Sequence, residues 1–184
     1  TGKMGYEIAK EARDRGANVT LISGPTSLDI PTGVNFIKVN TNEEMLNAVL
    51  DNFNDSNIVV KSAAVADFNV KEYSKEKIKK TDSNLVIELE RDKDILETLG
   101  KQKTNQIIVG FAAESSNVIE NAKAKLKRKN IDYIVANDIK SNDTGFASDD
   151  NKVTIISSLG DVISLDKMSK REVAKNIFDM IKGR

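Results

Sequence analysis

Residues 107–112 have the sequence Ile-Ile-Val-Gly-Phe-Ala, a short apolar run interrupted by glycine. Such a run is typical of a buried strand. Residues 116–129 follow with the pattern of an amphipathic helix, and a second apolar run extends from Ile131 to Val135. Strand, helix and strand in this order favour two parallel strands joined by a crossover helix, so we expect an α/β protein.

The same alternation extends along the chain in both directions. Further strands are predicted at 18–22, 34–39, 58–60 and 85–89, and further helices between Met4 and Gly16 and at 41–53, 94–99 and 170–181. Residues 153–157 and 162–165 form a predicted hairpin around Leu159-Gly160-Asp161. We therefore predict a Rossmann-like, mostly parallel sheet with helices on both faces, plus a C-terminal β-hairpin.

One domain accounts for the whole chain. Its 184 residues fit a single hydrophobic core. Thr1-Gly2-Lys3-Met4-Gly5 begins directly before a helix, and a glycine loop of this kind normally follows a strand. We treat residues 1–184 as a single domain and expect its first strand upstream of residue 1.

The composition excludes several classes of function. The chain has no Cys and no His, which excludes disulfides, thiolate metal sites and a histidine general base. Lys and Arg total 28, as do Asp and Glu, so no net charge attracts nucleic acid or an anionic membrane. The chain also has no membrane-spanning apolar run and no signal-peptide pattern, so we expect a cytoplasmic protein. We expect it to bind neither nucleic acid nor a membrane.

Ligands of parallel α/β sheets bind at the carboxyl ends of the strands. This rule brings together the loops that follow Ile22, Val60 and Val109. Gly2 and Gly5, at a helix start, could place backbone N–H groups against phosphates, although tight packing explains a G-x-x-G pattern equally well.

Two of these loops carry side chains suited to a ligand. After the strand at 58–60, small residues let a ligand approach the backbone, and Asp67 then supplies a carboxylate that could equally be a helix cap or turn former. Phe111 could stack on a base or a ribose, or belong to the core, and Gly110 could admit a ligand to the backbone.

The next helix and strand add further candidates. Lys125 and Lys129 are four residues apart, hence on one helix face, and could reach the same pocket edge. Lysines are also favoured near a helix C-terminus by the dipole alone. Asn137, followed by Asp138, is a polar pair at a strand end that a turn would explain as well.

Residues 66–81 carry many lysines and few apolar anchors, a composition typical of a mobile loop. We expect this segment to be poorly ordered without ligand. The charge run Glu76-Lys77-Ile78-Lys79-Lys80 would ordinarily be a solvated surface, but on a loop at the strand ends it also suits a lid over a triphosphate.

A dehydrogenase is the first alternative function. Tyr73 and Lys77 match the Tyr-x-x-x-Lys pair of short-chain dehydrogenases, with Ser62 eleven residues before the tyrosine. Chance produces such a match easily in a lysine-rich chain. No acidic residue follows Ile22 to hold a ribose diol, which counts against NAD. A non-catalytic nucleotide-binding module is the second alternative.

The order of the motifs is more specific than any one of them. The chain contains Thr-Gly-Lys-Met-Gly at its start, Leu-Ile-Ser-Gly-Pro at 21–25, Ala-Ala-Val-Ala-Asp-Phe at 63–68, Lys-Ile-Lys-Lys at 77–80, Gly-Phe-Ala-Ala-Glu at 110–114 and Ile-Val-Ala-Asn-Asp at 134–138. In this order they resemble the phosphopantothenate–cysteine ligase (phosphopantothenoylcysteine synthetase) domain over nearly the whole chain. In bacteria that domain is commonly fused to an N-terminal, flavin-dependent decarboxylase, so the resemblance implies such a fusion. The resemblance also implies a homodimer.

The resemblance implies a CTP-dependent reaction with Mg²⁺. The carboxylate of 4′-phosphopantothenate attacks the α-phosphate, giving an acyl-cytidylate and pyrophosphate, and the amine of cysteine then displaces CMP. Lys77 is the implied catalytic residue, and Ala64 and Asp67 are implied substrate contacts. The implied nucleotide contacts are Gly2, Gly5, Lys61, Ser62, Ala63, Asp67, Lys77, Lys93, Asp94, Ile95, Leu96, Phe111, Lys125, Lys129 and Asn137.

Two features depart from the family's pattern. Where the family usually has Asn-Pro-Asp-Ile, this chain has Asp92-Lys93-Asp94-Ile95, which changes the turn implied to contact the base. The family's asparagine just before the glycine loop would precede residue 1. No metal ligand is implied residue by residue.

Overall fold

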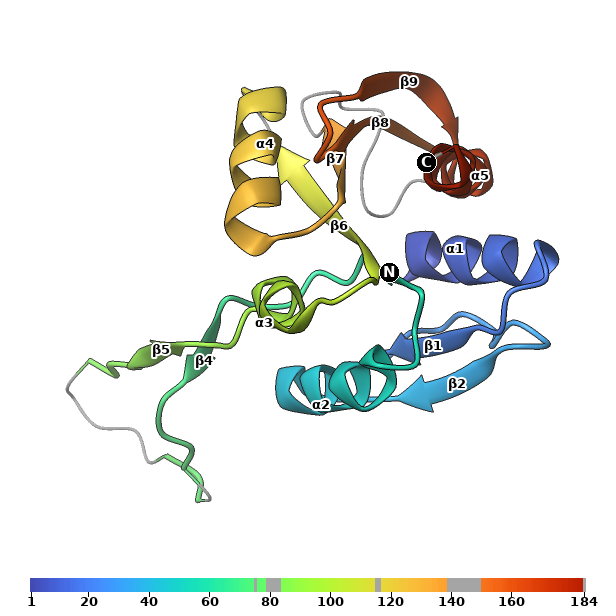
Figure 1. Cartoon of the computed structure of the whole chain (residues 1–184). Helices are drawn as coiled ribbons and strands as arrows, with labels where there is room; N and C mark the ends of the chain where they lie inside the picture. Colours follow the sequence, from blue (N-terminus) through green and yellow to red (C-terminus); the bar gives the residue numbers. More distant parts are fainter. Residues whose placement is uncertain (75, 79–83, 115–116, 139–149, 184) are drawn as a thin grey trace.

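The computed structural model describes residues 1–74, 76–78, 84–114, 117–138 and 150–183. Along the chain the elements are α1 (Lys3–Asp14), β1 (Thr20–Ser23), β2 (Asn35–Lys38), α2 (Asn42–Phe53), β3 (Ile58–Lys61), β4 (Phe68–Val70), β5 (Leu89–Arg91), α3 (Ile95–Gln102), β6 (Ile107–Glu114), α4 (Val118–Lys129), β7 (Tyr133–Asp138), β8 (Asp150–Ser157), β9 (Val162–Ser169) and α5 (Lys170–Lys182). Figure 1 shows their arrangement.

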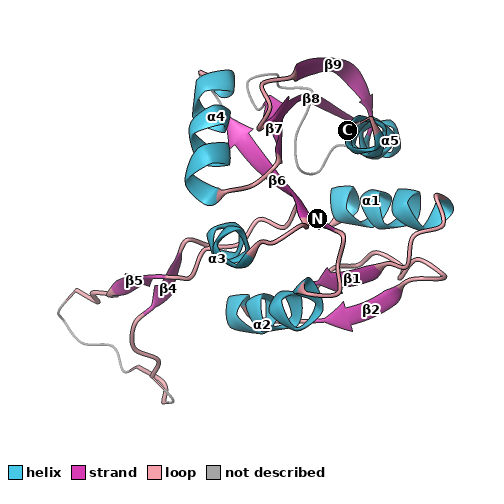
Figure 2. Ribbon diagram, in the orientation of Figure 1, coloured by secondary structure: helices cyan, strands magenta, loops and turns pink. Residues whose placement is uncertain are grey.

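The central sheet has the strand order β3-β6-β7-β8-β9. Strands β3, β6 and β7 are parallel, whereas β8 and β9 form an antiparallel hairpin at one edge. Two smaller sheets accompany it: β1 and β2 pair in parallel, and β4 and β5 pair antiparallel (Figure 2). The predicted α/β fold class, with a mostly parallel sheet and a C-terminal hairpin, is therefore confirmed.

Helices cover both faces of the central sheet, as predicted. The core on one face joins α1 and α5 to the strands, through residues such as Ile8, Val135 and Ile177. The core on the other face joins α2, α3 and α4, with Leu99 and Ile108 fully buried. Because side chains alternate along a strand, each central strand contributes to both cores.

Local sequence signals account for several helix boundaries. Thr41 accepts a hydrogen bond from Glu44 N at 3.1 Å to cap α2, and Ser169 and Glu172 form a full capping box at the start of α5. Helix α1 ends before Gly16, whose φ of 85° places it in the left-handed region that glycine adopts without strain.

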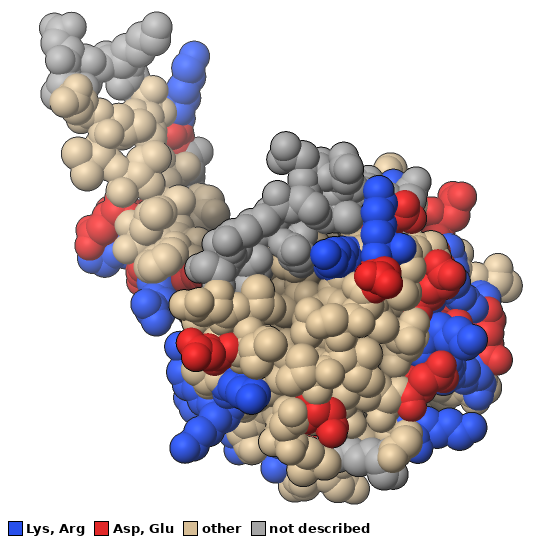
Figure 3. All heavy atoms as spheres, turned by 90° about the horizontal axis from the view of Figure 1, so that it is seen from above, with Lys and Arg blue, Asp and Glu red and all other residues tan. Residues whose placement is uncertain are grey.

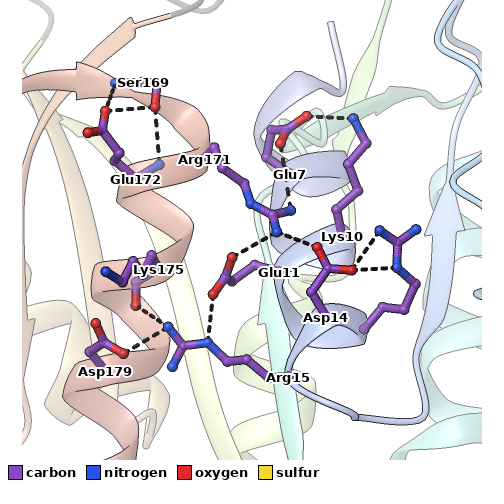
Figure 4. Close-up of polar contacts among 11 residues, drawn as sticks. Glu7, Lys10, Glu11, Asp14, Arg15, Ser169, Arg171, Glu172, Lys175 and Asp179 are labelled. Carbon is purple, nitrogen blue, oxygen red and sulfur yellow. Dashed lines mark hydrogen bonds and ion pairs between the residues drawn. The ribbon is translucent and has the colours of Figure 1, made fainter.

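Helices α1 and α5 lie side by side and are joined by a network of ion pairs (Figure 4). Arg171 approaches Glu11 at 3.0 Å and Asp14 at 2.5 Å, and Arg15 approaches Glu11 at 2.7 Å and Asp179 at 2.8 Å. The network ties the C-terminal helix to the helix that carries the glycine loop.

Helices α3 and α4 meet backbone to backbone at Gly100. A Cβ atom at this position would collide with the carbonyl oxygen of Lys129. Asn130 ends α4 with its backbone in the left-handed region, and its side-chain Nδ2 donates to Gly100 O at 2.8 Å. The absence of a side chain at position 100 therefore fixes how closely the two helices approach.

The segment that follows β6 residue Val109 was expected to be a loop, and this expectation is wrong. Strand β6 continues to Glu114, with Phe111 paired to Val135 and Ala113 to Asn137. A Cβ at Gly110 would lie 2.8 Å from Leu96 Cδ1, so this glycine makes room for α3 and not for a ligand.

The described residues between 68 and 91, namely 68–74, 76–78 and 84–91, are here called the arm and extend away from the body of the molecule (Figures 1 and 2). The prediction of a strand at 85–89 is wrong in its bounds, because only Leu89–Arg91 forms β5. Segment 68–70 was expected to be irregular, yet it forms β4, and Arg91 stacks over the Phe68 ring at 5.9 Å. Alternating apolar residues predicted a half-buried strand, but Leu85, Val86 and Ile87 are 60–84% exposed because none of the described helices or strands covers them.

None of the helices in the described ranges is long and apolar enough to cross a membrane. The expected poor order of residues 66–81 without ligand stays a prediction, and residues 75 and 79–83 of that segment lie outside the described residues. Lys79 and Lys80, the end of the Lys-Ile-Lys-Lys motif, are among them.

Candidate functional site at the carboxyl ends of the parallel strands

The N-terminus of α1 lies against the loops that follow β1 and β3. Gly2 caps the helix with a φ of 74°, in the left-handed region. A Cβ at Gly5 would lie 2.9 Å from Ser62 Oγ, so the first turn of α1 packs closely on the residue after β3. Tyr6 Oη donates to Ser23 Oγ at 3.4 Å on the β1 side. The first-turn N–H groups and the loops after two strands thus meet at one edge.

A cavity of about 70 Å³ opens beside this edge, toward α3 and α4. Most of its lining is charged, and it includes six sequence-predicted site residues. The lining residues are Lys61, Val65, Ala66, Asp67, Asp92, Lys93, Asp94, Ile95 and Lys129. The structure therefore brings together predicted positions that are separated by up to 68 residues in the chain (129 − 61).

Asp94 is the central carboxylate of the cavity. It caps α3 by accepting from Glu97 N at 3.1 Å, and Lys129 Nζ lies 2.6 Å from its Oδ2. Partial burial opposes ionisation of Asp94, but the hydrogen bonds from Lys129 and Glu97 N and the charges of Lys129 and Lys61 outweigh it, so its pKa is lowered. Asp94 is therefore ionised at neutral pH and holds Lys129 in place.

Lys61, the last residue of β3, is half-buried in the same cavity. Burial lowers the pKa of its ammonium, and the charge of Lys129 lowers it further, whereas Asp94 and Asp67 partly restore it. Among the described residues no side chain forms a hydrogen bond or ion pair with Lys61 Nζ. Among the three lysines that line the cavity, Lys129 is paired with Asp94, Lys93 is exposed, and Lys61 is the half-buried one that no described side chain pairs.

Asp92 frames the cavity from the turn before α3. It accepts from Asn42 Nδ2 and Asn69 Nδ2, each at 2.7 Å, and from Lys93 N at 2.7 Å. These hydrogen bonds, with Asn42 contributing most, lower its pKa. This residue is one of the departures from the family's usual turn, and its carboxylate joins α2 and the arm to the turn. The sequence showed that Asp92 departs from the family's pattern but did not show that its carboxylate joins these elements.

Asp67 offers a carboxylate that no described side chain engages. It is exposed at the cavity rim, and its backbone oxygen accepts from Asp92 N at 2.9 Å. Among the described residues there is no group of three or more acidic side chains that could hold a metal ion. A magnesium ion fits the site as it fits many nucleotide sites, through phosphate oxygens, water and one carboxylate, for which Asp67 is the suitable residue.

Other predicted nucleotide contacts differ in their exposure. Ile95 and Leu96 are 2% and 5% exposed and belong to the core, so only their backbone can contact a ligand. Phe111 is half-buried against the α1 and α5 core. Asn137 is 6% exposed, and its Oδ1 has no hydrogen-bond partner among the described residues. Lys125 lies one turn before Lys129 on α4 but does not line the cavity.

The remaining residues lie on the strand-end loop or on the arm. Ala63 and Ala64 are exposed directly after Ser62. Lys77 is exposed on the arm, whose described residues after β4 lie away from α3 (Figure 1). Tyr73 is 85% exposed on the same segment, whereas Ser62 lies beside Gly5. The structure does not bring together Ser62 and Tyr73, two residues of the dehydrogenase alternative.

Comparisons with known proteins identify relatives of this chain. A relative from Bacillus subtilis, a Coenzyme A biosynthesis bifunctional protein CoaBC, is 48% identical over 182 residues, which cover 98% of this chain and 45% of that protein. The protein of the same name from Borreliella burgdorferi is 46% identical over 184 residues, 98% of this chain and 46% of that protein. The chain spans about half the length of these curated relatives.

A solved structure shows the same fold. The crystal structure of the C-terminal domain of a CoaBC protein superposes with a TM-score of 0.84 at 42% sequence identity, covering 99% of this chain and 83% of that chain. The family model described as DNA/pantothenate metabolism flavoprotein C-terminal domain matches residues 1–183. The resemblance inferred from the ordered motifs is confirmed, and the chain belongs to this family.

Proposed function

We propose that the chain catalyses the CTP-dependent ligation of 4′-phosphopantothenate and cysteine, a step of coenzyme A biosynthesis. The observation that carries the proposal is the strand-end cavity, in which Lys61, Asp94 and Lys129 meet, across the end of β3 from the first turn of α1. The names of the relatives support the pathway. The identity of the nucleotide rests on the family resemblance.

Ligation needs an activated carboxylate. An oxygen of the 4′-phosphopantothenate carboxylate forms a bond to the α-phosphorus of CTP as the bond to the pyrophosphate oxygen breaks. The acyl-cytidylate that results has a good leaving group. The amine of cysteine then attacks the acyl carbon, loses a proton and displaces CMP. Neither step requires a histidine or a cysteine side chain, and the chain has none.

The residues of the chain have separate roles in this reaction. The backbone N–H groups of the first turn of α1 and the loop from Ser62 to Ala64 hold phosphoryl oxygens. Lys77 neutralises charge that develops at the α-phosphate, the role implied by its motif. Because Lys77 lies on the arm, the reaction needs the arm of a protomer to approach a cavity. Bound Mg²⁺ supplies further positive charge, and Asp67 offers it one oxygen.

We also propose a homodimer and fusion to a decarboxylase domain in the full-length protein. Two surfaces of the chain support self-association. The arm exposes Phe68, Leu85, Val86 and other apolar side chains, and β9 is an edge strand of the central sheet formed by the described residues. Seen from the side of α4 and β9, the body also has a broad area without charged side chains (Figure 3). The word bifunctional in the relatives' names supports a second domain.

The test is product formation by the chain with its upstream residues intact. With 4′-phosphopantothenate, cysteine, CTP and Mg²⁺ we expect pyrophosphate and CMP in equal amounts. Omission of cysteine should leave acyl-cytidylate and pyrophosphate without free CMP. An NAD(P)H-linked absorbance change without pyrophosphate would support the dehydrogenase alternative. CTP binding without turnover would support the non-catalytic module, and either result would overturn the ligase proposal.

A further inference from the structure

Lys61 is the charged group of the cavity whose environment is least explained by the fold. Its side chain is half-buried at the end of β3, and no described side chain accepts a hydrogen bond from its ammonium. An ammonium that is removed from water without a partner destabilises the folded protein. A cation that lies in a cavity, has a shifted pKa and lacks a partner among the described side chains is typical of a ligand-binding position.

The direction of the Lys61 side chain follows from the register of β3. Val59 packs against the core formed with α3 and α4, and Lys61, two residues further on, faces the same side. Its neighbours Asp94 and Lys129 belong to those helices. Ser62 lies instead against Gly5, on the side of α1. Lys61 and the first turn of α1 are therefore on opposite sides of the strand end.

The two sides of the β3 end suit the two ends of a nucleotide, the triphosphate on the side of α1 and the base on the side of Lys61. Phosphates that are held by the first turn of α1 place the sugar and the base across the strand end, toward Lys61. Most polar groups there are already used. Asp94 accepts from Lys129 and Glu97 N, and Asp92 accepts from two asparagines and from Lys93 N. Lys61 is thus the half-buried donor that remains for the base.

We propose that the Lys61 ammonium donates a hydrogen bond to the acceptor edge of the nucleotide base and makes this residue a determinant of the preference for cytosine. Cytosine presents a carbonyl oxygen and a ring nitrogen side by side as acceptors, whereas adenine has no carbonyl oxygen. A half-buried ammonium left without an oxygen acceptor disfavours the wrong base. This inference rests on the proposed function only for the choice of CTP.

The experiment compares binding of CTP, ATP and inorganic tripolyphosphate by calorimetry, with the Lys61→Met variant and Lys101→Met as a control. Lys101 is exposed, and its pair with Glu97 lies one helix turn from the cavity. For Lys61→Met we expect CTP to bind about tenfold or more weakly, which corresponds to about 1.4 kcal/mol. Binding of tripolyphosphate should be unchanged, and the preference for CTP over ATP should be lost.

Other outcomes overturn the inference. Equal weakening of CTP and tripolyphosphate would mean that Lys61 binds phosphate. Unchanged CTP binding, or a wild-type chain that does not prefer CTP to ATP, would remove Lys61 as a base-reading residue. Because binding needs no turnover, a wild-type chain that prefers CTP but forms no pyrophosphate would refute the proposed ligase activity and leave this inference intact.

Two further measurements separate ligand recognition from a structural role. Without ligand, Lys61→Met should melt at a higher temperature than the wild type, because a half-buried charge without a partner is removed. A lower melting temperature would indicate a structural lysine and contradict the inference. The Lys61 ammonium, whose pKa is lowered, faces Asp67, Asp94 and Lys129. The wild type should therefore lose CTP affinity as the pH rises through this pKa. The affinity of the Lys61→Met variant should not change over the same pH range.

Discussion

Lys129, at the end of α4, places its ammonium 2.6 Å from the Asp94 carboxylate that caps α3. The side chains are 14% and 34% exposed, so the pair is shielded from water more than a typical surface salt bridge. One carboxylate therefore completes a helix cap, joins two helices and forms a wall of the candidate site.

Replacing Lys129 by Met should lower the free energy of unfolding by about 1–2 kcal/mol, because a charge-assisted hydrogen bond is lost. It should also raise the pKa of Asp94. A carboxylate with a lowered folded-state pKa contributes stability above its ordinary value of 3.8, and that stability is lost as the pH falls through the folded-state pKa. The variant should lose this contribution at a higher pH, as urea unfolding between pH 2 and 7 would measure.

Lys101→Met is the matched control for this prediction. Lys101 forms a helical ion pair with Glu97 at 2.8 Å, but its side chain is 73% exposed. We expect a change within about 0.5 kcal/mol. Equal losses for the two variants would show that the contact with Asp94 has no special contribution.

Replacing Gly5 by Ala should separate helix stability from ligand binding. Alanine favours the helix by about 1 kcal/mol relative to glycine, and the φ of Gly5 is not positive. The added Cβ would approach Ser62 Oγ at 2.9 Å, however, and displace the residue after β3. We expect unchanged or higher thermal stability with weaker CTP binding. Adding Ser62→Ala removes the clash and should restore part of the affinity, and failure of this rescue would refute the explanation.

Replacing Lys77 by Gln should affect chemistry without affecting folding. Lys77 is exposed on the arm, so the free energy of unfolding should change by less than about 0.5 kcal/mol. If its ammonium stabilises charge in the transition state, kcat should fall by roughly 10²-fold or more. The control Lys71→Gln removes the same charge from the arm, where Lys71 pairs with Glu88 at 2.6 Å. A raised KM with normal kcat would mean that Lys77 only attracts the nucleotide.

Replacing Arg171 by Gln should loosen the contact between α5 and α1. The guanidinium lies within 4.0 Å of Glu7, Glu11 and Asp14, and its loss leaves three carboxylates close together (Figure 4). We expect the melting temperature to fall by about 2–4 °C at low salt and by less at high salt. Lys167→Gln removes a charge from the exposed side of β9 and should have no such effect. A loss that is independent of salt would argue against an electrostatic cause.

Replacing Val86 by Lys should weaken self-association through the arm. Val86 is 84% exposed, so the substitution should not affect folding of the protomer. Light scattering should show a dimer for the wild type at micromolar concentration and a monomer for the variant. Ile163→Lys tests the hairpin in the same way, since Ile163 is 44% exposed on β9. A monomeric wild type would contradict the proposed homodimer.

The sequence predicted elements well where two independent signals agreed. The helices at α2 and α5 have both an apolar face and a side-chain cap, Thr41 and Ser169, and both were located closely. The arm shows the opposite case. Leu85 to Leu89 has the alternation of a half-buried strand, but burial depends on a second layer that the local pattern does not report.

The candidate site was predicted in part. The cavity is lined by the segment after β3, by the turn before α3 and by Lys129 of α4, whereas the segments after Ile22 and Val109, which the strand-end rule placed with the β3 loop, do not line it. Gly110 was misinterpreted, since its missing side chain accommodates Leu96, a contact between residues 14 positions apart (110 − 96). The roles of Asp92 and Lys61 depend on neighbours from α2, α3, α4 and the arm, which spacing along the chain cannot reveal.

Gly100 has a consequence for the interpretation of mutational scans. Any side chain at this position would push α3 away from the last turn of α4, and Asp94 and Lys129 are carried by these two helices. A library selected for growth would therefore tolerate only glycine there and would rank position 100 beside residues that touch the ligand. Parallel selection for folded protein abundance would show that its intolerance comes from helix spacing alone.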